Sequence, residues 1–277
     1  AYHYGKGKIA AITGTNGKTT TTALVGEIVK AHNAKTIVVG NIGIPYTELC
    51  DTTDDDSDTV AEISSFQLET VIDFHPNVSA ILNLTPDHLN RHYTFENYGN
   101  VKFSITKNQT MDDVTVLNYD DEHTRARGEK AKDHCHVVYF SRLEKPAGGV
   151  YVEDGDIILE DGDKKINVLA IKDLKLMGAH NVENVLAAVG ISYYMGVPVD
   201  VIRDVATSFK AVAHRIEYVD TVDGVAYYND SKGTNPDAAI KGIQAMVAPT
   251  FLIGGGYDKG SECDEWIEAF DGKVKWL

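Results

Sequence analysis

The chain has 277 residues, 43% of them hydrophobic, and a formal charge of −15 from 26 basic and 41 acidic residues. These proportions are typical of one large or two ordinary globular domains and exclude general disorder and a collagen-like chain. The acid excess argues against a protein whose main partner is nucleic acid or an anionic membrane. Small anions stay possible, since backbone amides, a few cations and bound metal can hold them.

The cysteines and the N-terminus indicate where such a protein would work. Cys50, Cys135 and Cys263 are far apart and form no CxxC pair, which fits a reducing compartment. No apolar run approaches the roughly 18 residues that span a bilayer, and the first residues lack the apolar segment of a signal peptide. We therefore expect a cytoplasmic α/β protein without a membrane partner.

Short apolar runs alternate with helical patterns in the first part of the chain. Strands are predicted at 8–13, 35–40, 59–64, 78–84, 114–119 and 136–140, with a helix over 18–32. Runs that are apolar on both faces are what a buried parallel sheet requires. The order predicts a doubly wound, mostly parallel sheet with right-handed crossovers.

The pattern changes after residue 149. Residues 149–170 contain Asp-Gly turn signals between alternating runs, which predict a small antiparallel meander. Helices are expected at 181–195 and 199–209. A second β-α-β pattern begins near 211, with a helix from 236 to 246 and a strand at 250–255. We expect two domains, a central one at 1–210 and the incomplete, Rossmann-like beginning of another at 211–277.

The strongest signal is a glycine-rich turn between the strand at 8–13 and the helix at 18–32. Glycines allow a tight turn that points successive N–H groups at phosphate oxygens, and the helix N-terminus adds partial positive charge. Lys18 would reach the β- and γ-phosphates and the Thr19 hydroxyl would bind Mg²⁺. Ile12 stands where the general P-loop has its first glycine, so this is a variant loop. Its candidate ATP-binding residues are Gly14, Thr15, Asn16, Gly17, Lys18, Thr19 and Thr20.

Two other strand ends carry polar side chains. Glu62 lies near the end of the predicted strand at 59–64, where a metal-binding or water-positioning carboxylate is expected. The alternative is an ordinary polar residue at a strand end. His88 follows the strand at 78–84 and is either a ligand or a capping residue. Thr94 would cap the next predicted helix. Lys102 lies at the edge of the apolar stripe of that helix, so its side chain either extends to solvent or has a buried partner.

Six motifs occur in the order found in the Mur ligases, ATP-dependent amino-acid ligases of peptidoglycan synthesis, and the whole chain resembles this family. They are TGTNGKTTT, AEISSFQLE, ILNLTPDHLNRH, GAHNVENVLAA, HRIEYV and YYNDSKGTNPDAA. Within the family, SSFQLE and NDSKGTN favour a ligase that adds D-glutamate to UDP-N-acetylmuramoyl-L-alanine. The resemblance thus implies three substrates, which are ATP, that UDP-sugar and D-glutamate. We also expect a monomer.

The resemblance also implies domain and residue roles. Residues 1–210 would form the ATP-binding domain, and residues 211–277 would begin the amino-acid-binding one. A second magnesium ion would be held by Glu62, His88 and Lys102, the last carbamylated by CO₂, and Lys18, Lys102 and His88 would be the catalytic residues. Asn184 would read adenine, Arg215 would contact phosphate and Asp230 the ribose. The residues expected on the side of the amino-acid and UDP-sugar substrates are Asn41, Asn83, Lys232, Thr234 and Lys259.

Departures from the family pattern leave other functions open. Asn90 and Ala213 stand where the family usually has acids, and the chain is expected to lack an N-terminal domain and part of a C-terminal one. The alternatives are another ligase of the superfamily, such as a folylpolyglutamate synthetase or a Mur enzyme adding a different amino acid, and a nucleotide-binding module without chemistry.

Overall fold

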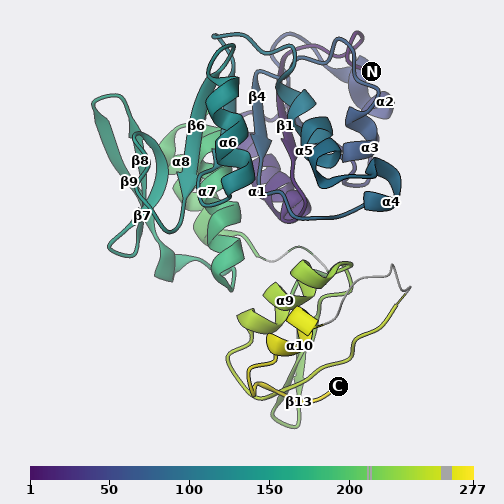
Figure 1. Cartoon of the computed structure of the whole chain (residues 1–277). Helices are drawn as coiled ribbons and strands as arrows, with labels where there is room; N and C mark the ends of the chain where they lie inside the picture. The colour runs from purple at the N-terminus through teal and green to yellow at the C-terminus, as the bar shows by residue number, and fades with distance from the viewer. Residues whose placement is uncertain (211, 213, 257–263) are drawn as a thin grey trace. The chain divides into compact units, whose positions relative to one another are not determined.

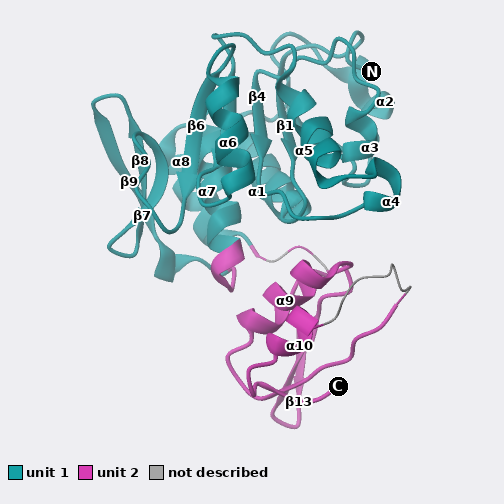
Figure 2. Ribbon diagram, in the orientation of Figure 1, with its two compact units in different colours: residues 1–175, 181–209 teal, residues 176–180, 210–277 magenta. Residues whose placement is uncertain are grey.

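The computed structural model describes residues 1–210, 212, 214–256 and 264–277. They form two compact units, which are taken separately here (Figure 2). Unit 1 comprises residues 1–175 and 181–209, and unit 2 comprises residues 176–180 and 210–277. The assignment of an ATP-binding role to one part and an amino-acid-binding role to the other stays a prediction.

Unit 1 is built on one nine-stranded sheet with the order β2-β3-β1-β4-β5-β6-β7-β8-β9 (Figure 1). Every neighbouring pair from β2 to β7 is parallel, and the last two pairs are antiparallel. The strands are β1 (Lys8–Thr13), β2 (Ile37–Gly40), β3 (Asp58–Glu62), β4 (Val78–Ile81), β5 (Val114–Asn118), β6 (His136–Ser141), β7 (Gly149–Glu153), β8 (Asp156–Asp161) and β9 (Lys164–Ala170). The mixed α/β fold with a mostly parallel sheet is confirmed.

Helices cover both faces of this sheet, as the doubly apolar strands require. On β5, Val116 approaches Gly190 of α7, whereas the next residue, Leu117, approaches Gly128 of α6. Tyr98 and Ile105 share the core cluster that contains Leu117. The helices are α1 (Lys18–His32), α2 (Tyr46–Leu49), α3 (Ser65–Leu68), α4 (Leu89–His92), α5 (Phe95–Phe103), α6 (Glu122–Ala131), α7 (Ala179–Tyr194) and α8 (Val199–Ser208), with 3₁₀ turns at Cys50–Thr52, Ser104–Thr106 and Ile171–Asp173.

The predicted meander is present and is continuous with the main sheet. Strands β7, β8 and β9 pair antiparallel, while Phe140 and Ser141 of β6 pair in parallel with Val150 and Tyr151 of β7. This pairing makes the meander part of the nine-stranded sheet.

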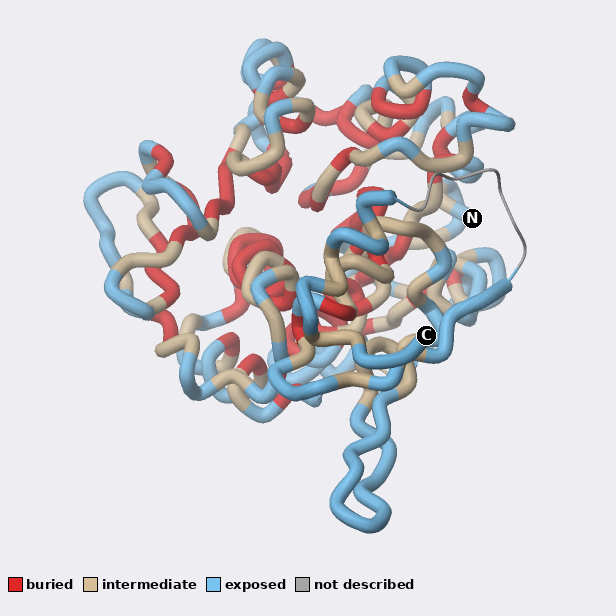
Figure 3. Tube along the Cα trace, turned by 60° about the horizontal axis from the view of Figure 1, so that its bottom comes forward, coloured by how far each residue is buried: buried red, intermediate tan, exposed pale blue. Residues whose placement is uncertain are grey.

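Unit 2 is a smaller assembly of short elements. A hairpin joins β10 (Glu217–Val222) to β11 (Val225–Asn229), α9 (Pro236–Ala245) follows, and β12 (Thr250–Phe251) pairs in parallel with β13 (Val274–Trp276) beyond α10 (Asp264–Glu268). The predicted strand at 250–255 is therefore shorter than expected. Most residues of the hairpin are exposed, whereas the sheet and helices of unit 1 hold most of the buried residues (Figure 3).

Candidate functional site

The loop between β1 and α1 has the backbone of a phosphate-binding turn. Gly14 and Gly17 have φ values of +148° and +81°, a region that glycine enters without penalty. Gly17 is the N-cap of α1, and within the described chain no side chain caps this helix. The first N–H groups of a helix have no partner inside it, so they are directed at whatever occupies the space before it.

Two lysine side chains converge on this turn. Lys18 Nζ donates to the carbonyl oxygens of Gly14 and Thr15, at 3.0 and 2.8 Å. Lys102, on α5, donates to the same Gly14 oxygen at 2.8 Å and lies 3.4 Å from Thr13 Oγ1. The structure thus brings together two of the three residues that the sequence identified as catalytic.

Lys102 is buried, with only 2% of its surface exposed. Its ammonium group lies 4.8 Å from the centre of the Tyr98 ring, one helical turn earlier on α5. Burial lowers the pKa of Lys102 well below its ordinary value, and the charge of Lys18 lowers it further, while Asp87 and Glu62 act in the opposite direction. Of the two sequence-based alternatives, the buried partner is therefore correct and the snorkelling lysine is wrong.

Glu62 lies at the C-terminal end of β3 and is 1% exposed. Its Oε1 accepts a hydrogen bond from Asn41 Nδ2 at 2.8 Å, so Asn41 and Glu62 are brought together. Its Oε2 is buried and has no hydrogen-bond partner among the described residues. A buried carboxylate oxygen left unpaired is costly unless a cation neutralises it. An oxygen of this kind is a suitable ligand for Mg²⁺.

His88 has a left-handed backbone conformation, with φ of +53°, immediately before α4. Its ring lies 4.9 Å from that of Phe66, and its Nε2 is 3.6 Å from Asp87 Oδ2. Within the residues that the structure describes, no group of three or more His, Cys, Asp or Glu side chains is arranged to hold a metal ion. A metal site using Glu62 and His88 would therefore need ligands of other kinds, such as the Thr19 hydroxyl or phosphate oxygens.

Asn184, on α7, packs against the phosphate loop. A Cβ placed on Gly17 would overlap Asn184 Oδ1, so any larger residue there would have to displace the Asn184 side chain. The same oxygen accepts from Thr21 Oγ1 at 3.3 Å, and Nδ2 donates to Asn181 at 3.0 Å. The adenine-reading role of Asn184 stays a prediction.

A further group of predicted residues belongs to unit 2. Asp230 Oδ1 accepts from the backbone N–H of Ile216 at 3.2 Å. Burial raises the pKa of Asp230, while that hydrogen bond and the charge of Arg215 oppose the increase. The N–H of Lys232 donates to His214 O at 3.1 Å. Thr234 lies just before α9, which Asn235 caps. Lys259 and Ala213 lie outside the described residues.

Two buried groups were given no role in the sequence analysis. The Tyr98 hydroxyl donates to Thr15 Oγ1, in the phosphate loop, at 3.1 Å. Buried His92 contacts Ser65 Oγ at 3.0 Å through Nε2 and Glu69 Oε1 at 3.4 Å through Nδ1. Both depend on contacts between distant segments, for which the sequence carries no local signal.

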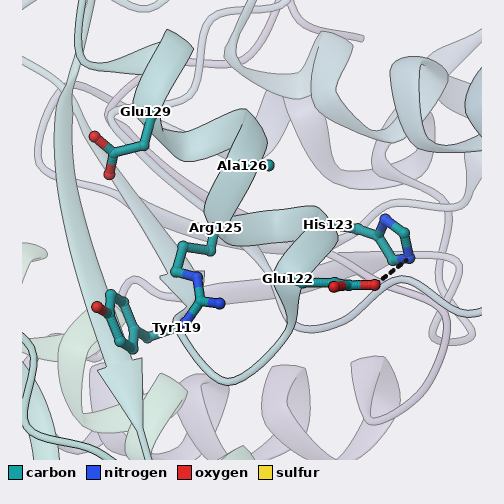
Figure 4. Close-up of a pocket in the computed structure, with 6 residues that line it drawn as sticks. All are labelled: Tyr119, Glu122, His123, Arg125, Ala126 and Glu129. Carbon is teal, nitrogen blue, oxygen red and sulfur yellow. Dashed lines mark ion pairs between the residues drawn. The ribbon is translucent and has the colours of Figure 1, made fainter.

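A separate open pocket of about 670 Å³ lies on α6, and none of the predicted site residues lines it (Figure 4). Figure 4 shows the Arg125 guanidinium beside Tyr119, 4.9 Å from the ring centre, and the Glu122–His123 ion pair. The residues that line this pocket are Tyr119, Glu122, His123, Arg125, Ala126 and Glu129. In the described chain, no helix is both long enough and apolar enough to span a bilayer.

Comparison with known sequences gives consistent matches. The sequence profile of the Mur ligase middle domain matches residues 12–192. A protein of Lachnospira eligens named UDP-N-acetylmuramoylalanine–D-glutamate ligase is 58% identical over 277 residues, which are 100% of this chain and 61% of the relative. A protein of Lachnoclostridium phytofermentans with the same name is 54% identical with the same coverage. The chain thus spans about three fifths of the length of these curated relatives.

Solved structures share the fold. The crystal structure of MurF from Acinetobacter baumannii aligns with a TM-score of 0.71 at 21% identity, covering 90% of this chain and 56% of that one. MurF from Thermotoga maritima, in complex with ADP, aligns with a TM-score of 0.70 at 19% identity and covers 97% and 64% of the two chains. On the match of its middle domain and on these relatives, the chain belongs to the Mur ligase family.

Proposed function

We propose that the protein containing this chain joins D-glutamate to UDP-N-acetylmuramoyl-L-alanine at the expense of ATP, in the synthesis of peptidoglycan precursors. The proposal rests on one observation above the others. A glycine turn leads into an uncapped helix N-terminus, and the side-chain nitrogens of Lys18 and Lys102 meet at the Gly14 carbonyl beside it. The names of the relatives at 54–58% identity support D-glutamate as the added amino acid.

ATP would bind with its phosphates in the turn that ends at Gly17. The amides at the start of α1 and the Lys18 ammonium would hold the β- and γ-phosphates, and Thr20 would border the site. Asn184, Arg215 and Asp230 would take the adenine, phosphate and ribose contacts that the family resemblance implies.

Two magnesium ions would accompany the nucleotide. Thr19 would bind one of them, and the unpaired oxygen of Glu62, together with His88 and a carbamylated Lys102, would bind the other. When bound, Mg²⁺ would offset the repulsion between a carboxylate and a triphosphate. The lowered pKa of Lys102 supports carbamylation, because an uncharged amine is the form that adds to CO₂.

In the proposed reaction, the terminal carboxylate of the UDP-sugar substrate attacks the γ-phosphorus, and ADP leaves. The uncharged amine of D-glutamate then attacks the carbonyl carbon of this acyl phosphate, phosphate leaves, and the nitrogen loses a proton. Lys18 would stabilise charge on the transferred phosphoryl oxygens. Asn41, Lys232, Thr234 and Lys259 would contact the acceptor and amino-acid substrates. We further propose a monomeric, cytoplasmic enzyme.

Phosphate release tests the proposal. We expect release from Mg·ATP that requires both UDP-N-acetylmuramoyl-L-alanine and D-glutamate, with L-glutamate, L-lysine and diaminopimelate inactive in place of D-glutamate. Turnover with one of those amino acids instead would identify a different ligase of the superfamily. If a protein as long as the curated relatives binds Mg·ATP without turnover, it is a nucleotide-binding module.

A further inference from the structure

Asn83, which follows β4, holds the phosphate loop by three hydrogen bonds. Its side-chain oxygen accepts from the N–H of Asn16 at 2.8 Å, and its side-chain nitrogen donates to the carbonyl oxygen of Asn16 at 3.1 Å. Its own carbonyl oxygen accepts from the N–H of Thr15 at 3.0 Å. One asparagine therefore pairs with three successive peptide units in the middle of the loop, those that join Gly14 to Gly17.

This pairing limits which loop groups can bind a phosphate. The N–H groups of Thr15 and Asn16 are both directed at Asn83. The Thr15 hydroxyl donates to Thr85 O at 3.1 Å and accepts from Thr85 N and from the Tyr98 hydroxyl. A hydroxyl with one donor bond and two acceptor bonds has used its full capacity. Neither of these two N–H groups, nor the Thr15 hydroxyl, is left to bind a phosphate.

The segment that carries Asn83 is itself anchored on both sides. The N–H of Leu82 donates to Thr13 O at 3.0 Å, and Leu82 O accepts from Asn118 Nδ2 at 3.0 Å. The N–H of Leu84 donates to Asp121 Oδ2 at 2.6 Å. Asn83 thus projects from a fixed backbone, as a residue that sets the conformation of another loop must.

We propose that Asn83 is a positioning residue for nucleotide binding, not a contact for the UDP-sugar substrate. Its side-chain amide fixes the Asn16 peptide plane and so turns the following N–H groups, from Gly17 onward, towards the phosphates. This inference rests on the proposed function, because it assumes that ATP occupies the loop. It replaces the substrate contact that the sequence suggested for Asn83.

Two variants with side chains similar in size to asparagine separate the donor and acceptor contributions of the Asn83 side-chain amide. Asn83→Asp keeps the acceptor for Asn16 N–H but places an oxygen 3.1 Å from the Asn16 carbonyl, where the donor had been. Asn83→Leu removes both bonds. Asn108→Asp is the matched control, because Asn108 is similarly half-buried and its Nδ2 donates to the carbonyls of Ile72 and Phe74, away from the loop.

Calorimetric titration of each variant with Mg·ATP gives the first readout, with melting temperature recorded alongside. We expect both Asn83 variants to lose about tenfold in ATP affinity, while Asn108→Asp melts earlier but binds ATP as the wild type does. In an active preparation, we expect KM to rise for ATP and stay unchanged for the UDP-sugar substrate.

The contrary results are distinct. Wild-type ATP affinity in both Asn83 variants, or a rise in KM confined to the UDP-sugar substrate, would overturn the positioning role and leave the proposed function standing. Failure of the wild-type protein to bind ATP would overturn the proposed function itself.

Discussion

Lys18 and Lys102 donate hydrogen bonds to the same atom, the carbonyl oxygen of Gly14, although they lie 84 residues apart in the sequence. Burial lowers the pKa of Lys102, and repulsion from the like charge of Lys18 lowers it further. An anion placed between them, whether a triphosphate or a carbamate on Lys102, would relieve that repulsion. The predictions below follow from this arrangement and from the contacts around it.

Carbamylation is expected at Lys102, because its pKa is lowered by burial and by Lys18. In protein equilibrated with ¹³C-bicarbonate, the carbon NMR spectrum should contain a carbamate signal that Lys102→Arg removes and that substitution of the exposed Lys107 leaves in place. A spectrum that is the same for the wild type and Lys102→Arg would contradict the carbamate.

Glu62→Gln should reduce the stabilisation of the protein by Mg²⁺ and leave the fold intact. The substitution removes the charge of a buried carboxylate whose Oε2 has no partner in the described chain, so the metal-free protein should melt at or above the wild-type temperature. Affinity for Mg·ATP should fall by about tenfold or more. Thermal shift with and without Mg²⁺ measures both, and Glu27→Gln, on the exposed side of α1, is the control. An undiminished response to Mg²⁺ would exclude Glu62 as a ligand.

Gly17→Ala should destabilise the protein in two ways. A residue with a side chain at φ of +81° costs about 1–2 kcal/mol, and the new Cβ would displace Asn184 Oδ1. Gly155→Ala is the matched control, since Gly155 has φ of +84° but no atom within 4 Å of the added Cβ. Urea unfolding should show a larger loss for Gly17→Ala, and only this variant should lose ATP binding. Equal losses would mean that the Asn184 contact is unimportant.

Stability should fall as the pH drops below about 6.5, partly because of His92. Burial lowers the pKa of His92 in the folded protein, although Glu69 opposes this, so the unfolded chain binds a proton at a higher pH than the folded one. Protonation then favours unfolding in this range. Denaturant titrations between pH 7.5 and pH 5 should show that the free energy of unfolding falls less steeply with decreasing pH in His92→Gln than in the wild type. An equally steep pH dependence of the free energy of unfolding in His92→Gln and the wild type would exclude a contribution of His92.

The sequence predicted the local features of the fold more fully than the long-range contacts of the site. The strand at Lys8–Thr13 and the Thr94 cap of α5 are confirmed, because apolar runs and capping side chains act on near neighbours in the chain. The pairing of β7 with β6 and the hydrogen bonds from Asn83 to Asn16 could not be predicted, since both depend on how separate segments come together. For Lys102, spacing left two alternatives that only packing could separate.

The central claim is that the turn before α1 is a triphosphate site in which the Lys18 ammonium is essential. Calorimetric titration with Mg·ATP of the wild type, Lys18→Met and a control at the exposed Lys107 tests it most directly. We expect saturable binding by the wild type and the control, and a loss of about 30-fold or more in affinity for Lys18→Met. Equal affinity in all three proteins would contradict it.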